Sequence, residues 1–392
     1  MKLPQVDLAS TKDVIARFIS FNTESSRSNL GLIDWAEQYV QSAGVRCSRT
    51  FNEDRTKATI CVSIGPQVSG GIVLSGHTDV VPVEGQAWSS DPYVLREFDG
   101  KLFGRGTCDM KAFGAIAIAH VSYFLAANIR RPIHIVLSYD EEVTSRGSIA
   151  AIEDFGRIEP RPSAVIVGEP TMMAVADTHK SISTYHTCVT GHEAHSSKPT
   201  LGANAIAGAC ELVSELYRLA TELEQRHVPG DDRLQPGYST INVGTIAGGT
   251  ARNILARECR FHWEFRGLPG VPQDLALRHI ERFAAEVTLP KLRRFASNSD
   301  IETTVGTEVP GLRAEPGSEA ETLALKLTQS NATVAMPFAT EAGQFQVRGY
   351  PTVLCGPGNV DQAHQPNEFI SIAQVERCMK FMRDLGQELG RD

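Results

Sequence analysis

Short apolar segments alternate with helical patterns along the first half of the chain. Residues 72–74, 133–137 and 164–167 are continuously apolar, which is typical of strands buried on both faces of a sheet. Residues 45–51 and 58–64 alternate between apolar and polar positions and predict two further strands. Because helical patterns lie between these strands, we expect an α/β domain. Its mainly parallel sheet would be flanked by helices and would bind ligands beyond the carboxyl ends of its strands.

Three segments of this half have helical patterns. Residues 10–13 (STKD) resemble a capping box that opens a helix ending near residue 20. Residues 30–43 predict a second helix, which Gly44 would end. Residues 112–127 are small and apolar almost throughout, which predicts a single helix packed against the sheet.

The order of the expected elements changes after about residue 180. A strand, a helix, two strands, a helix and a last strand are expected over residues 183–189, 203–226, 238–246, 259–266, 272–287 and 301–305. This order suits a small α+β sandwich. We therefore expect a catalytic domain of residues 1–180 and 310–392, interrupted by an inserted α+β domain of residues 181–309.

Composition narrows the class of protein without identifying it. The chain has 392 residues, 42% hydrophobic and 21% charged, with a net charge of −8, which is ordinary for a globular enzyme. Charges of both signs are interspersed, which argues against a nucleic-acid or membrane surface. Residues 1–7 contain no apolar leader, no apolar run is long enough to span a membrane, and the eight cysteines form no C-x-x-C pair. We expect a cytoplasmic protein with reduced cysteines.

Histidine and acidic residues follow the predicted strands. His77 comes after the strand at 72–74, and a carboxylate two residues later, Asp79, can orient an imidazole that binds zinc. Glu141 and Glu142 place two like charges beside buried surface, which costs free energy unless cations or protons offset it. A divalent metal would resolve this conflict: one carboxylate would bind it while the other takes a proton from the water that the metal activates.

Each of these signals has a plainer alternative when it is considered alone. A lone histidine such as His77 or His364 is more often structural than a metal ligand, and Asp109 and Glu169 follow glycine-containing turns that acidic residues often occupy. Considered jointly, two imidazoles and three carboxylates suit a pair of borderline metals such as zinc, with one carboxylate bridging the two ions.

Six stretches resemble, in order and spacing, the motifs of the two-zinc aminoacylase and deacylase family of metallopeptidases. They are residues 75–82 (SGHTDVVP), 104–111 (GRGTCDMK), 140–142 (DEE), 168–171 (GEPT), 191–197 (GHEAHSS) and 248–254 (GGTARNI). The resemblance covers nearly the whole chain. It implies a zinc-exopeptidase-like catalytic domain with an inserted domain that serves as lid and dimerisation module.

The resemblance also implies a role for each metal-binding candidate. His77 and Glu169 would hold one zinc ion, Glu142 and His364 would hold the other, and Asp109 would bridge the two. Cobalt or manganese can replace zinc in such sites.

The resemblance further implies roles for groups next to the metal ligands. Asp79 would orient His77, and Glu141 would act first as general base and then as general acid. The peptide bond between Asp109 and Met110 would be cis, which is costly for a bond that does not precede proline.

The inserted domain would complete the active site. By resemblance His195 would stabilise the oxyanion of the tetrahedral intermediate, often from the partner subunit of a homodimer. Asn253 and Arg266 would bind a carboxylate or acyl oxygen of the substrate, and Lys180 is a weaker candidate for the same task. For Arg266 an ordinary charge at a strand end is an equally good interpretation.

Three stretches near the C-terminus are most similar to the acetylornithine deacetylases of this family: residues 340–345 (TEAGQF), 355–358 (CGPG) and 361–369 (DQAHQPNEF). We therefore expect hydrolysis of N²-acetyl-L-ornithine in arginine biosynthesis. Glu341 would pair with the cationic side chain of this substrate, or else would only interact favourably with a helix dipole. The alternatives are another N-acyl-amino-acid hydrolase, such as a desuccinylase or a broad aminoacylase, and a non-catalytic metal-binding relative.

Overall fold

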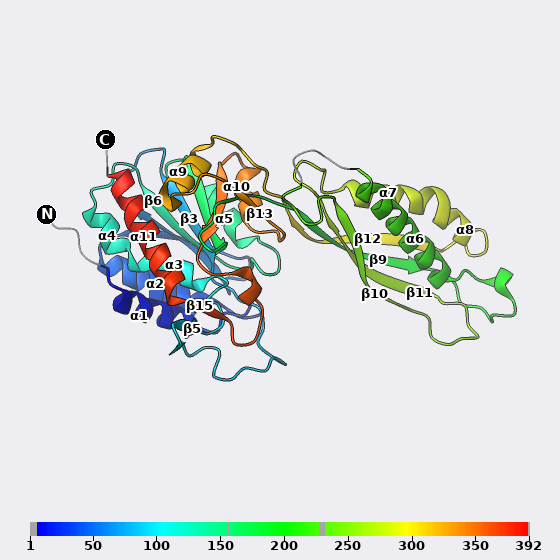
Figure 1. Cartoon of the computed structure of the whole chain (residues 1–392). Helices are drawn as coiled ribbons and strands as arrows, with labels where there is room; N and C mark the ends of the chain where they lie inside the picture. Colours follow the sequence, from blue (N-terminus) through cyan, green and yellow to red (C-terminus); the bar gives the residue numbers. More distant parts are fainter. Residues whose placement is uncertain (1–5, 156, 158, 227–231, 391–392) are drawn as a thin grey trace. The chain divides into compact units, whose positions relative to one another are not determined.

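The computed structural model describes residues 6–155, 157, 159–226 and 232–390. They form two compact units (Figure 1). The first unit consists of Met1–Thr178, Ala314–Ala335 and Thr340–Asp392, and the second of His179–Arg313 and Met336–Ala339. Each unit has its own hydrophobic core. The expectation that the chain starts without an apolar leader rests partly on residues 1–5, which lie outside the described residues.

The first unit is built on an eight-stranded sheet. In spatial order its strands are β1 (Arg46–Phe51), β2 (Ala58–Ile64), β6 (Ile133–Ser138), β3 (Ile72–His77), β7 (Ala164–Pro170), β14 (Thr352–Gly356), β8 (Ala176–His179) and β13 (Val334–Met336). β6, β3, β7 and β14 pair in parallel, whereas β1, β2 and β8 join by antiparallel pairing. The parallel strands are buried along their whole length, as the continuous apolar runs of β3, β6 and β7 predict. The predicted fold class is confirmed.

Helices cover both faces of this sheet (Figure 1). One face shares a hydrophobic core with α1 (Leu8–Ile19), α2 (Leu30–Ser42), α3 (Lys111–Ala119), α4 (Val121–Ala126), α9 (Glu319–Thr328) and α11 (Ile372–Leu389). On the opposite face lie α5 (Gly147–Asp154) and α10 (Ala342–Gln346), which contact each other and the sheet. A Cβ atom at Gly168 of β7 would lie 2.1 Å from the ring of Phe113 on α3, so α3 can pack this closely only against glycine.

A small antiparallel sheet connects two distant parts of the first unit. Its strands are β15 (Phe369–Ser371), β5 (Lys101–Phe103) and β4 (Arg96–Phe98). Phe369 pairs with Phe103. This pairing places the start of the loop at Gly104 next to the segment that connects the short 3-10 helix η3 (Val360–Gln362) to β15.

The second unit is an antiparallel sheet covered by helices. Its strand order is β10 (Thr240–Gly248), β11 (Glu258–Arg266), β9 (Ile182–Thr190) and β12 (Asp300–Val309). The helical segments are η1 (Pro199–Leu201), α6 (Ala205–Glu224), α7 (Leu275–Phe283), the π-helical turn η2 (Ala284–Thr288) and α8 (Leu289–Arg293). Alternate residues of β9 are buried, as expected for a sheet with one covered face. Within the described ranges of both units, no helix combines the length and apolar content needed to cross a membrane.

Three local expectations are wrong. α1 begins at Leu8 and is capped by Asp7, whose side chain accepts the N–H of Ser10; Ser10 is therefore not the cap. The single helix expected over residues 112–127 is broken at His120, where the ring bonds the carbonyl of Ile116. Among the described residues the only cis peptide bond joins Gln235 and Pro236. The bond after Asp109 is thus trans, the form favoured by about 2.5–4 kcal/mol for non-proline residues.

Candidate metal centre

The carboxyl ends of three neighbouring strands bring the acidic residues together. β6, β3 and β7 lie side by side in parallel. His77 is the last residue of β3, Glu169 is near the end of β7, and Glu141 and Glu142 follow β6. Parallel strands end at the same edge of a sheet, which is where open α/β folds bind their ligands.

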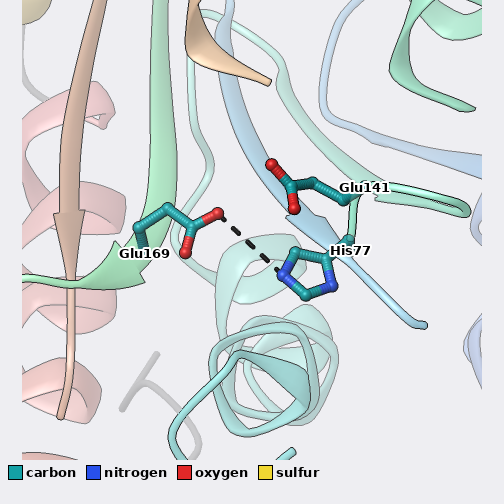
Figure 2. Close-up of side chains that lie close together, drawn as sticks. All are labelled: His77, Glu141 and Glu169. Carbon is teal, nitrogen blue, oxygen red and sulfur yellow. Dashed lines mark ion pairs between the residues drawn. The ribbon is translucent and has the colours of Figure 1, made fainter. Parts of the chain in front are cut away.

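His77 presents its Nε2 atom to this acidic group (Figure 2). Its Nδ1 atom donates to the backbone carbonyl of Asp79 over 2.9 Å, which leaves the lone pair of the neutral ring on Nε2. Nε2 lies 3.0 Å from Oδ1 of Asp109 and 3.9 Å from Oε1 of Glu169. The ring is therefore oriented as a metal ligand would be.

His364 meets the same aspartate from the other side. Its Nε2 atom lies 3.3 Å from Oδ2 of Asp109 and 3.0 Å from Oε2 of Glu142. The two oxygens of Asp109 therefore face two different imidazoles, Oδ1 toward His77 and Oδ2 toward His364. A carboxylate that bridges two cations needs this arrangement.

Two groups of donor atoms are compact enough to hold an ion. The donor atoms of His77, Glu141 and Glu169 all lie within 4.8 Å of one another, and so do those of His77, Asp109 and Glu142. Glu141 thus comes as close to His77 and Glu169 as a ligand would. The geometry places it inside the cluster without by itself distinguishing a ligand from a base.

The electrostatics of the cluster fit a pair of divalent cations. Burial raises the pKa values of Glu141 and Glu169 well above their ordinary range, and raises that of Glu142 to about 6. Burial would also raise the pKa of Asp109, but the close imidazoles of His364 and His77 outweigh it and lower that pKa. If all are ionised, the four carboxylates carry a charge of −4, which two dications would balance. The buried carboxylates and two imidazoles are a donor set that borderline divalent metals accept.

Asp79 has other partners than the sequence suggested. Its Oδ1 atom is 3.6 Å from Nδ1 of His77, too far for a hydrogen bond. Instead the carboxylate accepts the backbone N–H groups of Glu141 at 3.0 Å and Glu142 at 3.2 Å, and the hydroxyl of Ser25 at 2.7 Å. Asp79 therefore fixes His77 through its backbone, and the Glu141–Glu142 turn through its side chain.

Glu341 lies beneath the centre, on the face of the sheet that α10 covers. Its carboxylate is fully buried and accepts the hydroxyl of Ser75 on β3 at 2.6 Å and that of Ser138 on β6 at 2.7 Å. Both oxygens thus have partners within the first unit, and the carboxylate ties together the two strands that lead to His77 and to Glu141.

Sequence reasoning missed a second buried acid, Glu368, and its partner Arg105. Both side chains are almost fully buried, and Nη1 of Arg105 donates to Oε2 of Glu368 at 2.7 Å. The same carboxylate accepts backbone N–H groups of the loop that carries Asp109. Both residues belong to stretches that carried the family resemblance, and that position was the signal that could have revealed them.

The remaining sequence candidates belong to the second unit. His195 is exposed, and its Nδ1 atom accepts the N–H of Ser197, which leaves the proton of a neutral ring on Nε2. The strand-like segments of His195 and Asn253 are neighbours, because the N–H of Ser196 donates to the carbonyl of Asn253 at 2.9 Å. Within the same unit Arg266 pairs with Glu264 at 3.0 Å.

Lys180 is the last of these candidates. Its side chain is buried, and Nζ donates to the carbonyl of Tyr238 at 2.6 Å. This contact lies within the second unit and occupies one of the three ammonium protons.

Comparison with known proteins decides the family. The model of peptidase family M20/M25/M40 matches residues 73–388. The chain belongs to this family. Acetylornithine deacetylase of Yersinia pseudotuberculosis is 32% identical over 394 residues, covering 98% of this chain and 97% of the relative. Acetylornithine deacetylase of Myxococcus xanthus is 31% identical and covers 95% of both chains.

Solved structures of the family have the same fold. Aminopeptidase PepT from Bacillus cereus matches with a TM-score of 0.77 at 15% identity, covering 98% of this chain and 99% of the other. The metallo-carboxypeptidase Sso-CP2 from Sulfolobus solfataricus matches with a TM-score of 0.74 at 16% identity, covering 97% and 99%. Membership confirms the family predicted from the motifs and the prediction of a metal-dependent enzyme that hydrolyses amide bonds.

Proposed function

We propose that this M20/M25/M40 enzyme hydrolyses N²-acetyl-L-ornithine to L-ornithine and acetate, a reaction of arginine biosynthesis, in the cytoplasm. The observation that carries the hydrolytic part is the position of Asp109, whose two oxygens face His77 and His364. The relatives named acetylornithine deacetylase, similar over nearly their whole length, support the substrate.

The contacts of Asp109 with His77 and His364 support an assignment of the metal ligands. His77 and Glu169 would hold one zinc ion, His364 and Glu142 would hold the other, and Asp109 would bridge them. Zinc is proposed from the mixed imidazole and carboxylate donors, and cobalt or manganese would substitute for the same reason. When bound, such ions polarise the amide carbonyl and lower the pKa of the attacking water. A solved structure of the same family from Bacillus subtilis is described as a dinuclear metal-binding peptidase.

Glu141 is the residue that we assign as general base and general acid. Its backbone N–H is fixed by Asp79, and its carboxylate lies beside His77. From there it would take the proton of the attacking water and later give it to the leaving amine. A side chain that both accepts and returns a proton has to stay at one place through both steps, and Asp79 provides that restraint.

The second unit would supply the groups that contact the substrate. His195 would donate its Nε2 proton to the oxyanion, and Asn253 would act from the neighbouring segment. Arg266 would bind the α-carboxylate, with Lys180 as a weaker candidate. The exposed position of His195 is compatible with a role in a partner subunit's site, so we propose a homodimer formed through the second unit.

Glu341 has two competing roles. As a partner of the δ-ammonium group it would select ornithine, but both of its oxygens already bond serine hydroxyls. The two roles differ in their substrate dependence. Glu341→Gln would reduce the preference for acetylornithine over the uncharged N-acetylnorvaline if Glu341 contacts the cation. It would slow both substrates equally if Glu341 only supports the strands.

The decisive experiment compares hydrolysis rates of acetylornithine, succinyl-diaminopimelate and acetylmethionine by the same preparation. We expect acetylornithine to be the fastest substrate, with activity lost on metal removal and restored by zinc. A faster rate on the succinylated substrate would replace this proposal by a desuccinylase, and comparable rates on all three would indicate a broad aminoacylase. Bound metal without turnover of any of them would indicate a non-catalytic relative.

A further inference from the structure

The loop from Gly104 to Asp109 has no regular secondary structure that could hold it in place. Gly106 has a φ of +86°, a conformation that residues with a Cβ rarely adopt. The backbone N–H groups of Gly106, Cys108 and Asp109 nevertheless all have a partner: each donates to the carboxylate of Glu368, at distances of 2.7 to 3.1 Å. A single side chain thus takes the place of the strand or helix partners that a buried backbone needs.

The same carboxylate is also connected to the segment that carries His364. Glu368 is four residues beyond His364. Nη1 of Arg105 donates to its Oε2 atom, and Nη2 of Arg105 donates to Oε1 of Gln86 at 2.5 Å. Nε2 of Gln86 in turn donates to the backbone carbonyl of His364 at 2.9 Å. The chain of bonds therefore runs from the N–H of Asp109 through Glu368, Arg105 and Gln86 to His364.

We propose that Glu368 is a positioning residue that sets the placement of Asp109 relative to His364, acting through Arg105 and Gln86. The inference rests on the proposed metal site, because the role assigned to Glu368 is to present the shared carboxylate of Asp109 to the imidazole of His364. Every partner of the two Glu368 oxygens is a donor, so the ionised form is the one that satisfies them all. A neutral amide at this position would turn an NH₂ group toward Arg105 or toward the loop N–H groups.

Mutation of Glu368 would lower the stability of the fold even if its role were purely structural, so the test has to measure a different quantity. Burial of the Arg105 cation without its partner destabilises the fold whatever the function of the pair. The affinity for divalent ions separates the two roles, because partners of metal ligands typically contribute ~10–100-fold to metal affinity or activity. A misplaced Asp109 carboxylate should also lower kcat while leaving KM nearly unchanged.

The experiment measures zinc affinity by competition with a chromophoric chelator in the wild-type protein and in three variants. We expect Glu368→Gln to weaken binding of at least one ion by ~10–100-fold, and Gln86→Ala to weaken it by a smaller factor. The matched control is Glu159→Gln. Glu159 is also buried and also pairs with an arginine, Arg46 at 3.5 Å, but it precedes β7 at the end opposite Glu169. Its variant should bind zinc as the wild type does.

The outcomes are distinguishable. Absence of zinc binding by the wild type would overturn the proposed metal site itself. Wild-type zinc affinity in Glu368→Gln, with only a lower melting temperature, would overturn the positioning role. If Glu368→Gln fails to fold, Gln86→Ala decides, because Gln86 is only partly buried and unchanged zinc affinity there would break the proposed connection to His364.

Discussion

The candidate metal centre has two halves that the protein builds in different ways. The strand half consists of His77 and Glu169, which lie on β3 and β7 with side chains 1% and 5% exposed. The loop half consists of His364 and Glu142, which lie outside regular strands, and the His364 side chain is 53% exposed. His364 also has a φ of +61°, which is uncommon for a residue with a Cβ and costs free energy. The sheet preorganises one half, whereas long-range hydrogen bonds hold the other.

The difference has a consequence for metal binding. Ligands on a rigid, buried sheet lose little freedom when an ion binds, and solvent competes with them poorly. Ligands on loops have to become ordered when the ion binds, and water competes with an exposed imidazole for the ion. We therefore expect two unequal ion sites, the tighter one in the strand half.

The largest expected effect concerns Glu141, whose carboxylate lies beside His77 and Glu169 of the strand half. Glu141→Gln should keep both ions and lower kcat by ~10²–10⁴-fold, because a positioned acid or base contributes about that much. Steady-state kinetics together with elemental analysis of bound metal would measure this. Glu153→Gln, which removes an exposed charge on the next helix, is the control. Near-normal turnover in Glu141→Gln would remove Glu141 as the base.

The second effect concerns His195, which belongs to neither half. His195→Ala should lower kcat by ~10²–10³-fold, the typical loss for one oxyanion donor, without changing metal content. The exposed His192, three residues earlier, provides a matched control. Mixing the His195→Ala and Glu141→Gln proteins tests where the residue acts. If it acts in the partner's site, mixed dimers regain activity, because one of their two sites then has both intact residues.

The third effect tests the inequality of the halves directly. His364→Ala should retain about one tightly held ion per chain, whereas His77→Ala should lose that ion. In each variant the ion next to the missing imidazole should bind more than ~100-fold more weakly, a larger loss than that seen for partners of metal ligands. Metal content after dialysis against a series of zinc concentrations would show the difference. Equal residual binding in the two variants would mean that burial on the sheet does not make the strand half tighter.

The two halves also differ in how far the sequence could predict them. Periodicity located β3, β6 and β7, and parallel pairing then implied that His77, Glu141 and Glu169 would meet, because such strands end together. Nothing local predicted the partners of the loop half. Glu368 lies 260 residues from Cys108, and Gln86 lies 278 residues from His364, so these hydrogen bonds exist only in the folded chain.

Some short elements and local backbone features also escaped prediction. α10 and β13 are too short to show a periodic pattern. The cis bond expected after Asp109 came from the family resemblance alone, whereas the Asp7 cap is local, since its side chain accepts the N–H of Ser10 three residues away. The serine partners of Glu341 were equally invisible, although the acid itself was identified.

The smallest expected effect on activity concerns His134, which shares the sheet with His77 but is paired with no acidic side chain among the described residues. His134 on β6 is opposite Val73 of β3 and fully buried. Its Nδ1 atom bonds the Ser63 hydroxyl at 2.9 Å, and Nε2 has no partner among the described residues. Burial lowers the pKa of His134 to about 4, in contrast to His77, whose acidic neighbours outweigh the same desolvation and raise its pKa.

The sign of the pH effect follows from this shift. Above about pH 6.5 both folded and unfolded chains carry a neutral His134. Between pH 6.5 and about 4 the unfolded chain binds a proton that the folded chain excludes, so the free energy of unfolding falls as the pH falls. At pH 5 this one residue should cost about 2 kcal/mol. Denaturant unfolding of metal-free wild type and His134→Gln at pH 7.5 and 5 would measure it: the variant should lose less stability over that interval. His262→Gln, which changes an exposed histidine, should behave as the wild type does, and an identical loss in His134→Gln would show that the buried ring takes up its proton without unfolding.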